Sequence, residues 1–219
     1  MDEIGEKKAT HIIRIGSAPD FGGAIDRAGE YLITGRVVAF PSESFYGLAV
    51  DARSEEAIRR LFWLKRRRSD RPILVLLPSV EILGRYVSII PQIACQLIEA
   101  FWPGGLTLVF QAGSKISPLL TAGTGKIGVR LSSHPVATAL AQSIGVPITG
   151  TSANISETDA CRTAAEVSGM FGERLDLILD GGETSGKIGS TVLDVTVHPP
   201  RILREGMVSQ SQLRKFIGV

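Results

Sequence analysis

Short apolar runs alternate with segments of helical spacing along most of the chain, and this alternation constrains the fold more than any other feature. Residues 72–77, "PILVLL", are apolar at consecutive positions, which is typical of a strand covered on both faces of its sheet. Chains that alternate strands with helices form layered α/β domains. We therefore predict an α/β fold in which helices flank a mixed, mostly covered sheet.

Capping residues and glycines locate the ends of the expected elements. Ser54 is a suitable helix N-cap, with Glu55 and Glu56 in the first turn, and Gly35 and Gly145 follow the ends of helical patterns. The expected helices cover residues 20–33, 54–66, 91–102, 134–144 and 162–172, with a short closing helix at 209–216. The expected strands lie within residues 36–40, 72–77, 101–110, 126–131, 146–150, 175–180, 190–196 and 201–205.

Composition and length indicate one ordinary globular domain over residues 1–219, without repeats or low-complexity linkers. The net charge of +2 argues against binding polyanions by bulk charge alone. The two distant cysteines, Cys95 and Cys161, favour a reducing compartment, and Cys95 is expected in the core of an apolar helix. The N-terminus does not resemble a signal peptide, and no apolar run approaches the length of a membrane span. We expect a soluble, cytoplasmic protein.

A dense basic cluster precedes the apolar run 72–77. Cations suit a helix C-terminus, which explains one or two of these charges. At this density like charges repel one another, and Asp70 is the one acid between them. The cluster is therefore either a solvated helix end or an anion site, for which polyphosphate suits Arg and Lys best. Its members are Lys65, Arg66, Arg67, Arg68 and Arg71.

Three further polar segments stand beside expected strands, where α/β folds usually bind ligands. They are "PSESFYGL" at 41–48, the stretch from Arg130 to "TSANIS" at 151–156, and the glycine-rich "DGGETSGKIGST" at 180–191. Each can be a turn or a helix cap. Each can equally supply hydroxyl, amide or backbone groups to phosphate, ribose or carboxylate oxygens.

Several signatures are absent from the sequence. His11, His134 and His198 are isolated, so no protein metal site is expected, and His134 is read as a capping or surface residue. There is no P-loop, nucleophile elbow or catalytic Cys–His pattern. Glu43 and Asp180 have no evident partner, so the sequence indicates no carboxylate pair for acid–base catalysis.

Taken together, these segments resemble the YrdC-like family of threonylcarbamoyl-AMP synthases. "PSESFYGL" is similar to the family's P-T-E-T-V-Y-G-L, "LKRRRSDRPILV" to its K-x-R and following strand, and "FWPGGLT" to F-W-P-G-P-L-T. "VRLSSHPVA" resembles V-R-x-P-x-H-P, "TSANIS" the S-A-N-x-S motif, and "STVLDVT…ILREG" the S-T-V-(V/I)-D…I-L-R-x-G pattern. The matches run in the family's order over residues of about 35–206.

The resemblance implies a YrdC-like domain with a twisted mixed sheet and a positively lined concave groove. It implies that ATP, L-threonine and bicarbonate (or CO2) give threonylcarbamoyl-AMP and pyrophosphate, with Mg2+ carried by the ATP. The product would pass to tRNA-modifying transferase proteins as partners. Family members also bind double-stranded RNA, so RNA or tRNA is a further implied partner.

The resemblance also implies roles for individual residues. Lys65 and Arg67 would stabilise the transition state. The ATP-binding set would be Lys65, Arg67, Arg71, Ser152, Asn154 and Arg204. The threonine-binding set would be Ser44, Arg130 and Ser190, with Ser42, Tyr46 and Thr107 as further contributors.

Some positions depart from the family pattern. Ser42 and Ser44 replace threonines, and Leu76 stands where many members have a histidine. The chain also ends soon after "ILREG", so we expect the short form without an extra C-terminal domain. Two alternatives stay open: a YrdC-like paralogue with another carbamoyl substrate, and a double-stranded RNA-binding module.

Overall fold

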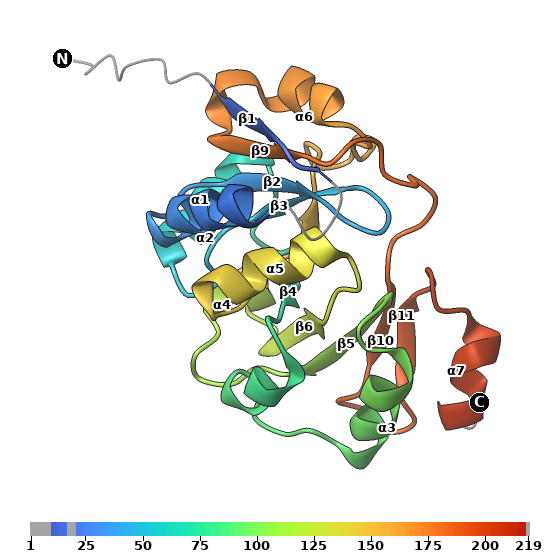
Figure 1. Cartoon of the computed structure of the whole chain (residues 1–219). Helices are drawn as coiled ribbons and strands as arrows, with labels where there is room; N and C mark the ends of the chain where they lie inside the picture. Colours follow the sequence, from blue (N-terminus) through green and yellow to red (C-terminus); the bar gives the residue numbers. More distant parts are fainter. Residues whose placement is uncertain (1–9, 17–20, 218–219) are drawn as a thin grey trace.

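The computed structural model describes residues 10–16 and 21–217, and its strands are divided between two mixed sheets flanked by helices (Figure 1). The five-stranded sheet has the order β1 (His11–Arg14), β9 (Leu177–Asp180), β2 (Val38–Pro41), β3 (Tyr46–Ala49) and β8 (Thr151–Ser152). The six-stranded sheet has the order β11 (Arg201–Arg204), β10 (Thr191–Asp194), β5 (Leu106–Gln111), β6 (Lys126–Arg130), β4 (Val75–Leu76) and β7 (Ile148–Thr149). The predicted α/β class is confirmed.

The helices follow most of the predicted segments. They are α1 (Gly22–Ile33), α2 (Glu55–Leu64), α3 (Gln92–Phe101), α4 (Pro118–Thr121), α5 (Pro135–Ile144), α6 (Ala164–Phe171) and α7 (Gln210–Ile217). Two short 3-10 helices cover Val80–Arg85 and Gly172–Arg174. The first residue of the helix expected at 20–33 lies outside the described residues. Among the described residues, no helix has the length and apolar character needed to cross a membrane.

Helices cover both faces of the five-stranded sheet. Helices α1 and α5 pack on one face, where Leu32 and Leu140 meet Phe40 and Leu177 in one buried cluster. The other face lies against a larger cluster that includes Leu61 of α2 and Phe171 of α6. In Figure 1, α6 lies at the top of the molecule, above β9, and α5 crosses the middle.

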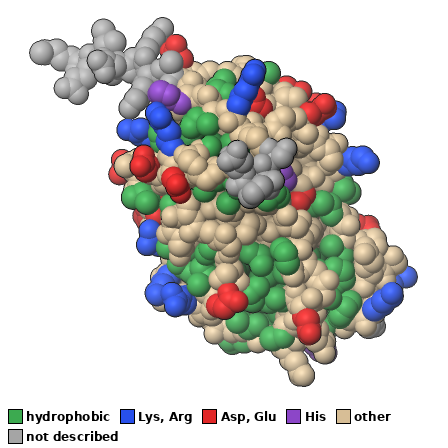
Figure 2. All heavy atoms as spheres, in the orientation of Figure 1, with side chains coloured by type: hydrophobic (Ala, Val, Ile, Leu, Met, Phe, Trp, Pro, Cys, Tyr) green, Lys and Arg blue, Asp and Glu red, His purple; other side chains and the backbone are tan. Residues whose placement is uncertain are grey.

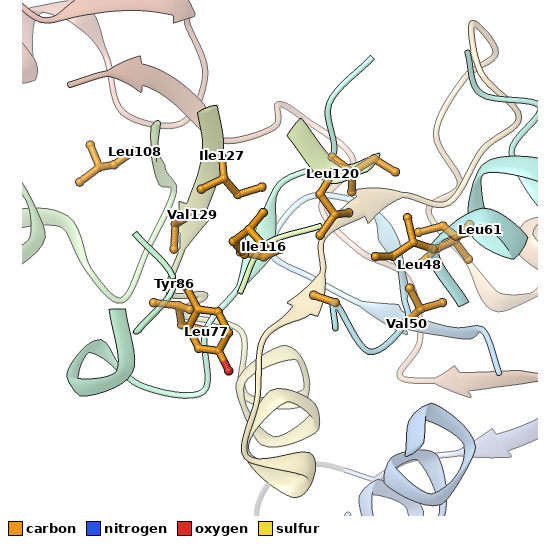
Figure 3. Close-up of a cluster of buried hydrophobic side chains, with 14 of the residues drawn as sticks. Leu48, Val50, Leu61, Leu77, Tyr86, Leu108, Ile116, Leu120, Ile127 and Val129 are labelled. Carbon is orange, nitrogen blue, oxygen red and sulfur yellow. The ribbon is translucent and has the colours of Figure 1, made fainter. Parts of the chain in front are cut away.

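The larger buried cluster joins the two sheets. Figure 3 shows Ile116 and Leu120 between Leu48 of β3 on one side and Ile127 and Val129 of β6 on the other. Because one continuous apolar core links both sheets, each sheet holds the other in place. That arrangement fixes the space between their edges, where the polar motifs lie.

The structure corrects several expected boundaries. Residues 41–48, for which the sequence allowed a turn or a helix cap, form the end of β2, the turn of a hairpin and the start of β3. Gly47 allows this pairing because a Cβ there would lie 2.7 Å from Cζ of Phe40. Helix α2 ends at Leu64 rather than Arg66, whose φ of 49° cannot continue a helix. Cys95 is exposed rather than part of the core.

Charge is mixed on the face drawn in Figure 2. Lys and Arg side chains alternate with Asp and Glu around the upper part and the outline, and hydrophobic side chains gather over the lower half. This face therefore offers no continuous basic surface, in keeping with the net charge of +2.

Candidate active site

A cavity of about 630 Å³ is lined by residues of both sheets, and we call it the central cavity. A cavity of this size accommodates a small-molecule ligand. Of the residues predicted for the site, those in its wall are Ser42, Ser44, Tyr46, Arg67, Thr107, Arg130, Ser152, Ser190 and Arg204. Lys65, Arg71 and Asn154 do not contribute to its wall.

The pairing of the strands places Arg130 and Arg204 on one wall of the central cavity. Leu76 of β4 lies opposite Arg130 of β6, and continuing the β5–β6 register beyond Leu108 and Val129 brings Thr107 opposite Arg130. Thr107 in turn lies opposite Val192, and Val192 opposite Arg204. Cross-strand partners project to the same face of a sheet, so this row forms one wall of the central cavity.

Arg204, Ser190 and Thr107 form one hydrogen-bonded group on that wall. Arg204 Nη2 donates to the Ser190 carbonyl at 2.8 Å, and the hydroxyls of Thr107 and Ser190 are 2.8 Å apart. Burial lowers the pKa of Arg204, and the nearby charge of Arg130 lowers it further. Two guanidinium groups close enough to disfavour each other's charge make this wall attractive to anions.

The turn between β2 and β3 and the first residue of β3 supply further hydroxyls to the cavity wall. The Ser42 hydroxyl donates to the Phe45 carbonyl at 2.6 Å, and the Tyr46 hydroxyl donates to the Gly182 carbonyl at 2.8 Å. Burial, together with the nearby charge of Asp180, raises the pKa of Tyr46 to about 12. Tyr46 therefore fastens the glycine-rich loop to the sheet and stays protonated.

The basic cluster is divided by the structure. Arg67 lines the central cavity and donates to the carbonyls of Arg71 and Pro72, at 3.1 Å from Nε and 2.8 Å from Nη2. Arg68 pairs with Asp70 on the surface at 2.7 Å. Arg71 is exposed. One member of the predicted anion site thus faces the cavity directly.

Lys65 is buried behind the cavity wall, with 1% of its surface exposed. Its ammonium group donates to the carbonyl of Ser152, to the carbonyl of Asn154 at 2.8 Å and to Asn154 Oδ1 at 3.1 Å. Burial and the charge of Arg67 lower the pKa of Lys65 to about 7, whereas the three oxygen acceptors favour the ammonium form. Lys65 therefore shapes the loop that carries Ser152 into the cavity.

The "TSANIS" loop is held by its own polar groups as well. The Ser152 hydroxyl donates to Asn154 Oδ1 at 2.6 Å, and Asn154 Nδ2 donates to the Thr158 carbonyl at 2.7 Å. The backbone of Ser156 also donates to the Lys65 carbonyl at 2.8 Å. Asn154 thus organises the loop, while Ser152 is the member that reaches the cavity.

Glu43 is the residue that the sequence analysis misjudged, because its partners come from a distant segment. Glu43 Oε2 lies 3.3 Å from Arg130 Nη2, with 13% and 9% of the two side chains exposed. Glu43 Oε1 accepts hydrogen bonds from the Ser132 hydroxyl at 2.6 Å and from the backbone amide of Ser133 at 2.7 Å. His134, predicted as a capping or surface residue, occupies the N-cap position of α5 without a side-chain cap hydrogen bond, and its amide also donates to Glu43.

Lys126 and Asp194 form another ion pair, which was not predicted from the sequence, and both of its residues line the central cavity. Lys126 Nζ donates to Asp194 Oδ2 at 2.9 Å. Residues four apart on a strand share a face, so the run "KIGVR" could have placed Lys126 beside Arg130. The basic residues of the wall are Arg67, Lys126, Arg130 and Arg204, against the acidic Asp194 and Glu205.

The donor set of the cavity does not form a metal cage. Within the described residues, no three His, Cys, Asp or Glu side chains gather at one point. Asp194 already accepts from Lys126 and Thr196, and Glu205 from the amide of Gln210.

Comparisons with known proteins agree with this picture. The family model Sua5_yciO_yrdC, described as "Telomere recombination", matches residues 30–206. The threonylcarbamoyl-AMP synthase of Pyrococcus abyssi is 37% identical over 191 residues, which cover 87% of this chain and 56% of that protein. The Bacillus subtilis protein of the same name is 35% identical over 195 residues, covering 89% and 56%. The chain therefore spans little more than half the length of these relatives.

A solved structure extends the match to three dimensions. The crystal structure of P. abyssi Sua5 complexed with L-threonine superposes with a TM-score of 0.89 at 34% identity, covering 95% of this chain and 61% of that one. The family match at residues 30–206 includes every described strand except β1, together with the motifs. On this evidence the chain belongs to the Sua5/YciO/YrdC family.

Proposed function

We propose that the protein is an L-threonylcarbamoyladenylate synthase, a nucleotidyltransferase whose substrates meet in the central cavity. Threonine and bicarbonate would first form a carbamate and water. A carbamate oxygen would then attack the α-phosphorus of ATP, and the bond to pyrophosphate would break. The observation that carries this proposal is a cavity wall rich in guanidinium and hydroxyl groups.

The chemistry of this reaction explains why a wall of guanidinium and hydroxyl groups is enough for catalysis. Negative charge accumulates on the attacking carbamate, the α-phosphoryl group and the departing pyrophosphate. Preorganised cations lower that barrier without a side-chain nucleophile. Arg67 and Arg204 would face the phosphates, with Ser152, while Lys65, Asn154 and Arg71 would support the surrounding loops. Mg2+, when bound with ATP, would neutralise phosphate charge.

The proposed threonine site centres on Arg130. Its guanidinium would pair with the substrate carboxylate, because a planar fork matches carboxylate geometry. Ser44, Ser190 and Thr107 lie in the same wall or opposite it and offer hydroxyl partners. Ser42 and Tyr46 hold the β2–β3 turn and its neighbouring loop, and so would position Ser44.

The test is pyrophosphate release by the purified protein with ATP, magnesium and bicarbonate, with and without L-threonine. Threonine-dependent release together with a product of threonylcarbamoyl-AMP mass is the expected result. Release that does not depend on an amino acid, or no release, would reject the proposal. Transfer to tRNA by separate modifying proteins, and cytoplasmic location, are further parts of the same proposal.

A different amino-acid substrate is favoured by one observation. Leu76, where many family members have a histidine, lies directly opposite Arg130 and lines the cavity. An aliphatic neighbour offers no hydrogen bond to a substrate hydroxyl, so valine and serine belong in the same assay. Turnover with valine above that with threonine would identify the protein as a paralogue with another carbamoyl substrate.

A further inference from the structure

Glu43 lies where the β2–β3 turn meets the end of β6 and the start of α5. It belongs to the β2–β3 turn of the five-stranded sheet, whereas Arg130 ends β6 of the six-stranded sheet. Its Oε1 accepts hydrogen bonds from Ser132, Ser133 and His134 at the start of α5. One carboxylate therefore ties the turn, the strand and the helix together.

The turn is fixed from its other side as well. The backbone carbonyl of Glu43 accepts from the Ser185 hydroxyl at 2.8 Å, and the carbonyl of Ser44 accepts from the Gly186 amide at 2.6 Å. The glycine-rich loop thus holds the backbone on which Glu43 stands. Because hydrogen bonds fix both its backbone and its Oε1, the position of Glu43 Oε2 next to Arg130 is fixed as well.

Arg130 depends on this contact for its placement. The side chain is almost fully buried, and its Nε has no hydrogen-bond partner among the described residues. Glu43 Oε2 is likewise buried without a hydrogen bond, so its ion pair with Nη2 is the polar contact that holds the guanidinium. Glu43 does not line the central cavity, so its contact with the site is made through Arg130.

From these contacts we propose that Glu43 is a positioning residue, which orients the Arg130 guanidinium so that it can receive the carboxylate of the amino-acid substrate. The inference rests on the proposed function, because it assigns Glu43 to the same site. It concerns a residue that does not touch the substrate and that supplies no proton to it.

The variant Glu43→Gln distinguishes the positioning of Arg130 by Glu43 from a direct effect of the Glu43 charge on the substrate. If the amide oxygen keeps the hydrogen bonds from Ser132 and Ser133, the amide NH2 group faces the Arg130 guanidinium, and two donors oppose each other. If the amide is turned, its oxygen still accepts from Arg130, but its NH2 group opposes the backbone amides of Ser133 and His134. The first orientation removes the acceptor of Arg130, and the second frees the turn from the start of α5. Either one loosens the placement of the guanidinium, so threonine recognition should weaken.

A purely electrostatic effect of Glu43 on the substrate predicts the opposite change in threonine binding. Glu43 carries the same charge as the substrate carboxylate, and removing that charge alone should strengthen binding. The positioning role predicts a higher Michaelis constant for threonine in Glu43→Gln, whereas charge repulsion alone predicts a lower one. Under the positioning role, Glu43→Gln raises this constant about tenfold, the cost of one charge-assisted hydrogen bond, while the constant for ATP changes less than about twofold.

Asp176→Asn is the matched control. Asp176 also pairs with an arginine, Arg60, at 2.8 Å, and accepts from the Val37 amide at 2.8 Å, with 14% of its side chain exposed. It does not line the central cavity. This variant should lose stability in the same way while keeping the wild-type Michaelis constants for both substrates.

The experiment measures pyrophosphate release at varied threonine and varied ATP, with L-threonine titrated by calorimetry alongside. An unchanged or lower constant for threonine in Glu43→Gln overturns the inference, as does an equal rise for both substrates. If Glu43→Gln does not fold, Ser132→Ala takes its place, with a rise of about two- to threefold expected for threonine alone. A wild-type protein without threonine-dependent release rejects the proposed function itself, and calorimetry then still compares threonine binding between variants.

Discussion

Arg130 shows how much of the proposed specificity depends on the shape of one side chain. Its guanidinium contacts Glu43 through Nη2 and still lines the central cavity. A planar group with five N–H donors can serve a carboxylate on each side, whereas an ammonium is a point charge on a flexible stem. Lysine has the same charge as arginine, but its ammonium group does not have the planar shape that can contact two carboxylates at once.

We expect Arg130→Lys to weaken L-threonine binding about tenfold and ATP binding by less than about twofold, because only the carboxylate contact needs the fork. Calorimetric titration of each ligand measures both constants on one sample. Equal losses for the two ligands would contradict the role given to Arg130.

Lys65 and Arg67 are two positions apart, yet the structure gives them different tasks. The ammonium of Lys65 serves three buried oxygens, and Arg67 faces the cavity. Lys65→Ala should lower the free energy of unfolding by about 1–3 kcal/mol, since those acceptors lose their donor. Arg67→Ala should raise the Michaelis constant for ATP by on the order of tenfold with little change in stability.

Urea unfolding and pyrophosphate kinetics on both variants separate these tasks. A stable Lys65→Ala protein with only a kinetic defect would place the ammonium on the substrate rather than on the loop. An Arg67→Ala protein with wild-type kinetics would remove Arg67 from the phosphate site.

Side-chain chemistry in the motifs could be predicted, but side-chain partners could not. The motifs pointed to Arg130, Ser190 and Arg204, all of which line one cavity. Glu43 was read as unpartnered because its partners, Arg130 and Ser132, are far along the chain. Whether a cation such as Lys65 faces a ligand or a carbonyl depends on packing that no local pattern records.

At the scale of elements, helix ends were predictable because their signals are local. The Ser54 hydroxyl accepts from the Ala57 amide at 3.2 Å, and Gly145 ends α5 with a φ of 65°. Strands were less predictable. The run 72–77 yields only Val75–Leu76 as β4, since strand length depends on which neighbours pair with it.

Helix α6 provides a test of such a local signal. The Thr163 hydroxyl accepts from the Glu166 amide, and the Glu166 carboxylate accepts from the Thr163 amide, which together form a capping box. Thr163→Ala should lower the free energy of unfolding by about 1 kcal/mol without changing the kinetic constants, because α6 does not line the cavity. Urea unfolding measures the loss, and an unchanged midpoint would show that tertiary packing alone fixes the start of α6.

At the scale of the whole molecule, the division into two sheets was beyond local patterns. The cavity is lined by strands of both sheets, and these sheets depend on pairings between distant segments, such as β2 with β9 and β5 with β10. Ion pairs then join the elements around it. Glu43 connects the β2–β3 turn to β6, and Lys126 of β6 connects to Asp194 of β10.

These ion pairs should make the molecule sensitive to acid. Burial alone would raise the pKa of Glu43, but the charge of Arg130 and the hydrogen bonds from Ser132 and Ser133 outweigh it and hold that pKa below its ordinary value. Burial likewise opposes, but does not overcome, the hydrogen bonds from Thr196 and Lys126 that lower the pKa of Asp194. Both carboxyl groups therefore bind protons less readily in the folded state than in the unfolded state.

The sign of the pH dependence follows from this difference. The unfolded chain takes up protons near its ordinary pKa values, about 3.9 for Asp and 4.3 for Glu, while the folded protein still resists protonation. The stabilisation is complete above those values and is lost as the pH falls through the lower folded-state values. We expect the contribution of these two carboxyl groups to the free energy of unfolding in urea to be complete above about pH 5 and to fall below about pH 4. Glu43→Gln should be less stable at neutral pH but fall less steeply in acid, and an equally steep fall in wild type and variant would show that Glu43 does not contribute to the link between the sheets.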